Sequence, residues 1–180
     1  MQLQTFSSPA PTLANVAWYA VQTSYRCEQR AAKDLTAKGF ETYLPLLREV
    51  HQWKDRRKAI EVPALSGYLF VRYEPFLRNR ICVLETQGVV RLLGSNHAPC
   101  PVSEQELDAL RRTLNSGLPV DRCDAVLPGA PVIVKRGALA GVHGRVVRIK
   151  SNLRLVVSIS AISQAVSAEL SVNDVEAVSL

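Results

Sequence analysis

A bend followed by a strand is predicted by the segment Val62-Pro63-Ala64-Leu65-Ser66-Gly67-Tyr68-Leu69-Phe70-Val71-Arg72-Tyr73. Pro63 fixes its own φ, and Gly67 tolerates a positive φ or a close backbone approach, so both residues mark the bend. The aromatic and β-branched residues after Gly67 favour a strand, in which side chains alternate between two faces. Tyr68 and Phe70 therefore share one face. Two interpretations stay open: a buried central strand, or an aromatic surface that binds a partner.

Upstream of this segment, the sequence predicts a strand and an amphipathic helix. The β-prone run 18–22 predicts the strand, and Thr23 or Ser24 then offers a hydroxyl N-cap. Gly39 stands where a left-handed residue ends a helix. Four residues at three- and four-residue steps form one stripe of this helix: Cys27, Ala31, Leu35 and Lys38. This spacing predicts that Glu28 points away from the stripe.

A charged hairpin is predicted between this helix and the bend. Residues 46–53 read as one strand and 59–62 as its return, and the tip is Lys54-Asp55-Arg56-Arg57-Lys58. Two interpretations of the tip stay open. It is either a solvated loop or a finger whose cations touch nucleic-acid phosphate, which adds affinity without reading sequence.

Downstream of the bend, residues 75–85 predict a helix and 89–94 a short strand. Ser103-Glu104-Gln105-Glu106 has the pattern of a capping box, in which Glu106 returns to the Ser103 N–H. It opens a helix with the apolar stripe Leu107, Leu110 and Leu114. Residues 17–115 therefore predict an α/β sandwich, an antiparallel sheet flanked by helices, after a mobile tail at 1–16.

The rest of the chain predicts a linker and a small barrel. Residues 116–127 contain Ser116, Gly117 and Pro119 without a usable period, which is typical of a linker. Five β-rich runs follow at 132–134, 145–149, 153–159, 165–170 and 175–180. They predict a closed barrel without free edges, and their β-branched residues disfavour a helical state. The fold class is α+β.

Composition limits the function classes. The 180 residues carry a net charge of +6, which favours an anionic partner, and there is no secretory or membrane-spanning pattern. A reducing cytoplasm and a monomer are expected. Three scattered histidines, four widely spaced cysteines and the absence of phosphate-binding glycine loops argue against an enzyme, a metal site or a cofactor.

The chain after Ala17 resembles the NusG family of bacterial transcription elongation factors. The first module carries Trp18-Tyr19-Ala20-Val21, Ser66-Gly67-Tyr68-Leu69-Phe70-Val71 and Val89-Val90-Arg91-Leu92-Leu93-Gly94. The second module, 128–180, contains Gly137-Ala138-Leu139-Ala140-Gly141-Val142-His143-Gly144-Arg145-Val146. This run is similar to a KOW motif, with Gly141 and Gly144 in its turn, so the expected barrel is SH3-like.

The resemblance implies two binding surfaces. The first module would bind the clamp helices of RNA polymerase and suppress pausing, through a seat formed by Trp18, Tyr19, Leu65, Gly67, Tyr68 and Phe70. The basic hairpin, with Arg48, Lys54, Arg56, Arg57 and Lys58, would face upstream DNA or the non-template strand. The tethered KOW domain would recruit a ribosomal protein or Rho through Ile159, Ala161 and Ile162.

Two departures favour a specialised paralog of the RfaH and UpxY kind, which acts as an operon-specific antiterminator. Ser66 stands where housekeeping members have proline, and the segment 158–166 lacks the aromatic residue of their KOW loop. Two alternatives stay open. One is the housekeeping factor that couples to Rho or the ribosome, and the other is an RNA- or ribosome-binding protein that uses its KOW domain.

Overall fold

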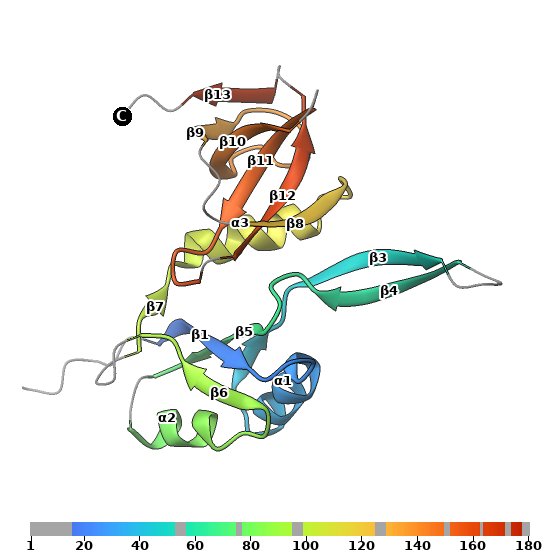
Figure 1. The fold of residues 1–180 in the computed structure, drawn as a ribbon. Helices are drawn as coiled ribbons and strands as arrows, with labels where there is room; N and C mark the ends of the chain where they lie inside the picture. Colours follow the sequence, from blue (N-terminus) through green and yellow to red (C-terminus); the bar gives the residue numbers. More distant parts are fainter. Residues whose placement is uncertain are drawn as a thin grey trace, which may run out of the picture.

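Two antiparallel sheets lie on either side of one helix, α3, and a long hairpin projects from the first sheet (Figure 1). The computed structural model describes residues 16–52, 57–74, 77–94, 99–124, 129–149, 152–162, 164–171 and 174–177. Within these ranges no helix has the length and apolar character needed to cross a membrane.

The first module is built on a sheet with the order β2-β5-β1-β6, and β7 also pairs with β1. Its apolar layer under the first two helices contains Tyr19, Leu35, Leu69 and Val83. The opposite face of the sheet carries Phe70 and points toward α3. The elements are β1 (Ala17–Thr23), α1 (Glu28–Ala37), β2 (Glu41–Tyr43), β5 (Tyr68–Tyr73), α2 (Leu77–Leu84), β6 (Val89–Leu92) and β7 (Pro101–Val102).

Helix α1 ends as predicted but begins later. Gly39 follows the C-cap with φ +88°, in the left-handed region that glycine favours. The predicted N-cap at Thr23 or Ser24 is wrong, because β1 continues through Thr23 and Cys27 is the N-cap. The expectation that Glu28 turns away from the core is also wrong, since its side chain is buried.

Helix α3 (Glu104–Leu114) begins after Ser103, and Leu107 and Leu110 on its apolar stripe are fully buried. The capping-box prediction is wrong. The Ser103 side chain makes no cap hydrogen bond, and the Glu106 carboxylate instead accepts hydrogen bonds from Ser160 in the second module. Local sequence predicted the start of the helix correctly. The Glu106 side chain makes a tertiary contact instead of the predicted capping hydrogen bond.

The hairpin is confirmed, but its return strand begins at Arg57, so Arg57 and Lys58 belong to the strand and not to the predicted tip. Strands β3 (Leu46–Gln52) and β4 (Arg57–Pro63) pair from Leu46 opposite Pro63 to Gln52 opposite Arg57. The tip residues Lys54 and Arg56 lie outside the described ranges.

The second module confirms the five predicted strands but not the closed barrel. The strands form a path β13-β9-β10-β11-β12-β8, and its end strands β13 and β8 do not pair with each other within the described residues. The predicted closure is therefore not confirmed. Residues 116–127, expected to be a linker, contain strand β8. The strands are β8 (Val120–Asp124), β9 (Ala130–Val134), β10 (His143–Ile149), β11 (Asn152–Ser158), β12 (Gln164–Leu170) and β13 (Val175–Ala177).

Candidate functional site

Strand pairing arranges the α3-facing side of the first sheet in rows, because residues directly opposite each other point to the same face. The rows are Tyr68–Gln22–Arg91, Tyr43–Phe70–Ala20 and Arg72–Trp18–Val102. Tyr19 points to the opposite face, where its ring lies 4.8 Å from that of Tyr73. Trp18 and Tyr19 therefore do not line one surface, contrary to the sequence-based expectation.

The remaining apolar residues of the predicted seat come together. We call Trp18, Leu65, Tyr68 and Phe70 the seat. Leu65 and Phe70 are 0% exposed, Trp18 is 3% exposed, and Tyr68 is half-buried. The Phe70 ring stacks on Tyr43 with 6.0 Å between ring centroids. The seat is thus apolar and continuous, and it is covered in this structure.

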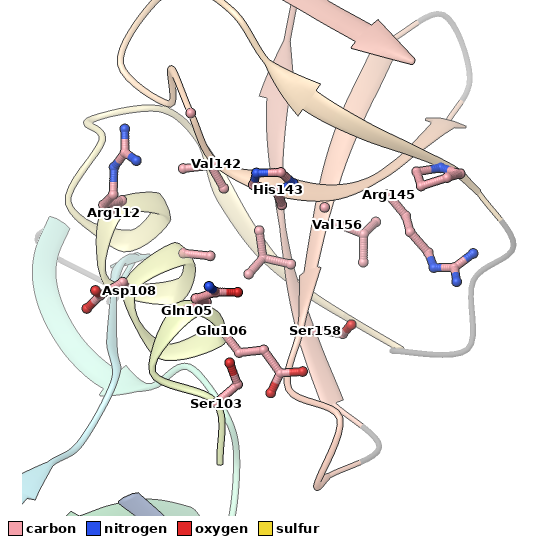
Figure 2. A pocket seen from close by; sticks show the side chains of 15 residues that line it. Ser103, Gln105, Glu106, Asp108, Arg112, Val142, His143, Arg145, Val156 and Ser158 are labelled. Atoms are coloured by element: carbon pink, nitrogen blue, oxygen red, sulfur yellow. The ribbon is translucent and has the colours of Figure 1, made fainter. Parts of the chain in front are cut away.

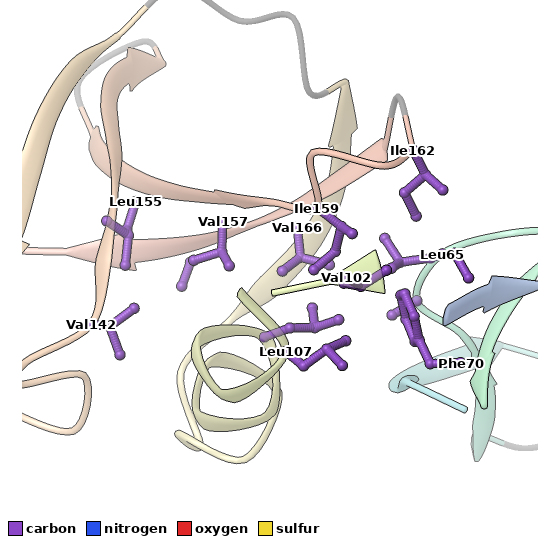
Figure 3. Close-up of a cluster of buried hydrophobic side chains, with 14 of the residues drawn as sticks. Leu65, Phe70, Val102, Leu107, Val142, Leu155, Val157, Ile159, Ile162 and Val166 are labelled. Carbon is purple, nitrogen blue, oxygen red and sulfur yellow. The ribbon is translucent and has the colours of Figure 1, made fainter. Parts of the chain in front are cut away.

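The cover consists of α3 and the second module. Figure 3 shows Ile159 and Ile162 on the loop after β11, on the side of α3 where Leu65 and Phe70 lie. Ile159 is 1% and Ile162 5% exposed, whereas Ala161 is half-buried. One cluster of buried side chains runs from Phe70 into the second module. The predicted polymerase seat and the predicted KOW partner surface therefore cover each other, and the second module packs on the first in this structure.

Helix α3 contributes a cation to this cover. The Arg111 guanidinium lies 5.1 Å from the centre of the Trp18 ring and 4.8 Å from that of Tyr43, within the range of cation–π attraction. Burial raises the pKa of Tyr43 to about 12, and the positive charge of Arg111 opposes part of that rise. Tyr43 therefore stays neutral over the physiological range.

Polar contacts surround the apolar interface. Gln164 Nε2 donates to the carbonyl of Ser66 at 2.9 Å. Arg122 pairs with Glu49 at 3.2 Å and donates through Nε to the carbonyl of Pro63 at 3.1 Å. Further hydrogen bonds join α3 to the second module. The Ser160 N–H donates to the Glu106 carboxylate at 3.3 Å, the Ser160 hydroxyl donates to the same carboxylate, and Arg112 donates to the Ala140 carbonyl. The interface has the apolar centre and polar rim of a specific contact.

A buried glutamate beneath the seat was missed by sequence reasoning. Glu28 is 5% exposed, and its carboxylate accepts a hydrogen bond of 2.8 Å from the N–H of Gly67. Gly67 has φ +78° and also accepts from the N–H of Thr23 at 2.8 Å. The only sequence signal for this contact is the positive-φ requirement of the bend.

A cleft of about 680 Å³ lies between α3 and strands β10 and β11 (Figure 2). Gly144 lines it, and a Cβ there would lie 2.7 Å from the carbonyl oxygen of Val156. Gly141 at its rim has φ +81°. Gly141 therefore suits the predicted turn, whereas Gly144 lies not in the turn but in strand β10, where the close approach of β11 favours glycine. The described residues contain no group of acidic, histidine and cysteine side chains that could hold a metal.

The hairpin carries part of the predicted basic surface. Arg48 and Lys58 are exposed on β3 and β4. Arg57 begins β4, but its side chain lies outside the described set, as do Lys54 and Arg56.

A family model described as "Transcription termination factor nusG" matches residues 16–111, more than half of the chain. The chain belongs to the NusG family. The matched residues include the first sheet, the hairpin and most of α3.

One solved structure extends the similarity of this NusG-family chain beyond the first module. The structure reporting a domain interaction in Thermotoga maritima NusG matches with a TM-score of 0.58 and 20% identity, over 92% of this chain and 98% of that chain. This similarity shows a shared fold. The MjSpt4:Spt5 complex in conformation B matches with a TM-score of 0.31 and 16% identity, over 91% and 97%. No curated protein matches.

Proposed function

We propose that this chain is a transcription elongation factor that binds the clamp helices of RNA polymerase through the seat and suppresses pausing or termination. One observation carries the proposal. The apolar face of the family-matched module is covered by the second module and α3, whereas α1 and α2 pack on the opposite face. A surface of Trp, Leu, Tyr and Phe is the kind that forms a protein interface.

Polymerase binding through the seat requires that the second module leave it. We therefore infer that polymerase and the 159–162 loop compete for Leu65 and Phe70. The domain interaction reported for Thermotoga maritima NusG supports contact between the modules as a feature of this fold. Release would also expose Ile159, Ala161 and Ile162, the residues we propose for recruiting a ribosomal protein or Rho.

We propose, more specifically, that the protein acts as an operon-specific antiterminator. Ser66 and the lack of an aromatic residue at 158–166 support it. A housekeeping factor remains the alternative, and binding of Rho to the full chain separates the two. Firm capture of Rho would favour the housekeeping role.

The hairpin suits a contact with upstream or non-template DNA. Arg48 and Lys58 are exposed on a hairpin that projects from the body of the protein (Figure 1). Cations in such a position add affinity through counterion release and carry no sequence information.

Binding of bacterial core RNA polymerase to Tyr68→Ala tests the proposal. Tyr68 is half-buried at the edge of the seat, so its loss removes contact area with less risk to folding than substitution of Phe70. We expect dissociation to become about thirtyfold faster, the effect of an interface hot spot of about 2 kcal/mol. Tyr25→Ala, a tyrosine that is 81% exposed in the same module, is the matched control. Equal dissociation rates for the two variants would refute the seat.

The salt dependence of binding distinguishes the polymerase function from the RNA- or ribosome-binding alternative. That function predicts RNA affinity that resides in the second module and falls steeply with salt. The polymerase function predicts binding that depends on the seat and only weakly on salt. Replacement of Lys54, Arg56, Arg57 and Lys58 by alanine should leave polymerase affinity nearly unchanged.

A further inference from the structure

The bend that presents the seat is a tight turn from Leu65 to Tyr68. The Tyr68 N–H donates to the carbonyl of Leu65 at 3.2 Å, and Gly67, the third residue, has φ +78°. These are the features of a type II turn, in which the third residue needs a positive φ. The turn places Leu65 and Tyr68, two of the four seat residues, on either side of the Ser66–Gly67 peptide.

Both polar groups of Gly67 are held from within the first module. Its N–H donates to Glu28 at 2.8 Å and its carbonyl accepts from Thr23 at 2.8 Å. The carbonyl of Ser66 instead accepts from Gln164 of the second module. When the second module leaves the seat, the turn loses the Gln164 contact and keeps the other two.

Burial makes the Glu28 contact costly to remove. A carboxylate that is 5% exposed needs hydrogen-bond partners, because desolvation without them is unfavourable. Its place in the first turn of α1 also favours a negative charge through the helix dipole. Glu28 thus anchors the turn to α1, an element on the far face of the sheet from the second module.

We propose that Glu28 is a positioning residue for polymerase binding. It keeps the Leu65–Tyr68 turn ordered after the seat is uncovered, so that polymerase meets a preorganised surface. This inference rests on the proposed function of the seat. The physical reason is that a preformed turn has already lost its conformational entropy, so polymerase binding does not have to order it.

The test is the dissociation rate of full-length variants from core RNA polymerase, because this rate does not depend on how firmly the free chain is closed. We expect Glu28→Ala to dissociate about tenfold faster, equivalent to ordering about one residue. Glu28→Gln retains an acceptor for Gly67 and should stay within about threefold of the wild type. Val83→Ala, which weakens the apolar layer under α1 and α2 away from the turn, controls for lost stability.

A rescue variant distinguishes positioning from stability. Proline presets φ at the second position of a type II turn, so Ser66→Pro should restore slow dissociation to Glu28→Ala. Fast dissociation of Val83→Ala, or failure of Ser66→Pro to rescue, would overturn the inference. If the wild type does not bind polymerase, the proposed function fails. The positioning role is then read from hydrogen exchange of the Gly67 amide, which should accelerate in Glu28→Ala and not in Val83→Ala.

Discussion

Truncation of Ile162 should open the chain. Ile162 is 5% exposed and belongs to the buried cluster that the second module shares with Leu65 and Phe70 (Figure 3). Ile162→Ala removes one methylene and two methyl groups from a buried site. Each contributes about 0.8 kcal/mol, so the free energy of closure should weaken by about 2.4 kcal/mol. The ratio of closed to open chain then falls about fiftyfold.

Polymerase affinity reports this shift. While the closed form dominates, the apparent dissociation constant is the intrinsic constant divided by the open fraction, so affinity should rise by up to the same factor. Small-angle X-ray scattering of the free variant should show a larger radius of gyration. The matched control is Val147→Ala, since Val147 is buried in a separate cluster of the second module. If Ile162→Ala and Val147→Ala bound polymerase equally and scattered alike, the competition between loop and polymerase would be refuted.

Two further predictions concern stability. Gly144→Ala should lower the free energy of unfolding by about 1–3 kcal/mol in urea titration, because its Cβ would lie 2.7 Å from the backbone oxygen of Val156 and force strands β10 and β11 apart; unchanged stability would contradict this close packing. Stability should also fall as pH rises from about 10 to about 12. Burial raises the pKa of both Tyr43 and Tyr73 to about 12, so the unfolded chain loses these protons first, and Tyr43→Phe should reduce the pH dependence.

Local rules predicted the elements that depend on neighbours in sequence. The hairpin, the end of α1 at Gly39 and the five strands of the second module follow from period, turn residues and β-branched content. Strand alternation alone already placed Tyr68 beside Phe70, and applied to Trp18 and Tyr19 it would have excluded Tyr19 from the seat.

Contacts between distant segments could not be predicted in this way. Glu106 has the spacing of a capping box, yet its carboxylate binds Ser160, 54 residues away. Glu28 lies on the polar side of a helical pattern, yet it is buried against Gly67. The position of β8 at the edge of the second sheet could not be predicted for the same reason. It lies in a segment without hydrophobic periodicity, and its place in the sheet depends on its pairing with the distant strand β12.

The position of Ile159 and Ile162 connects the two proposed binding events. Both side chains are buried against the seat, and both belong to the surface proposed for the second partner. A protein that captures this loop removes the cover from Leu65 and Phe70, and polymerase that occupies the seat frees the loop. Because coupling between two sites is reciprocal, each partner should raise the affinity for the other by the same factor. That factor cannot exceed one plus the closed-to-open ratio of the free chain, so Ile162→Ala, which lowers the ratio, should also reduce the cooperativity between the partners.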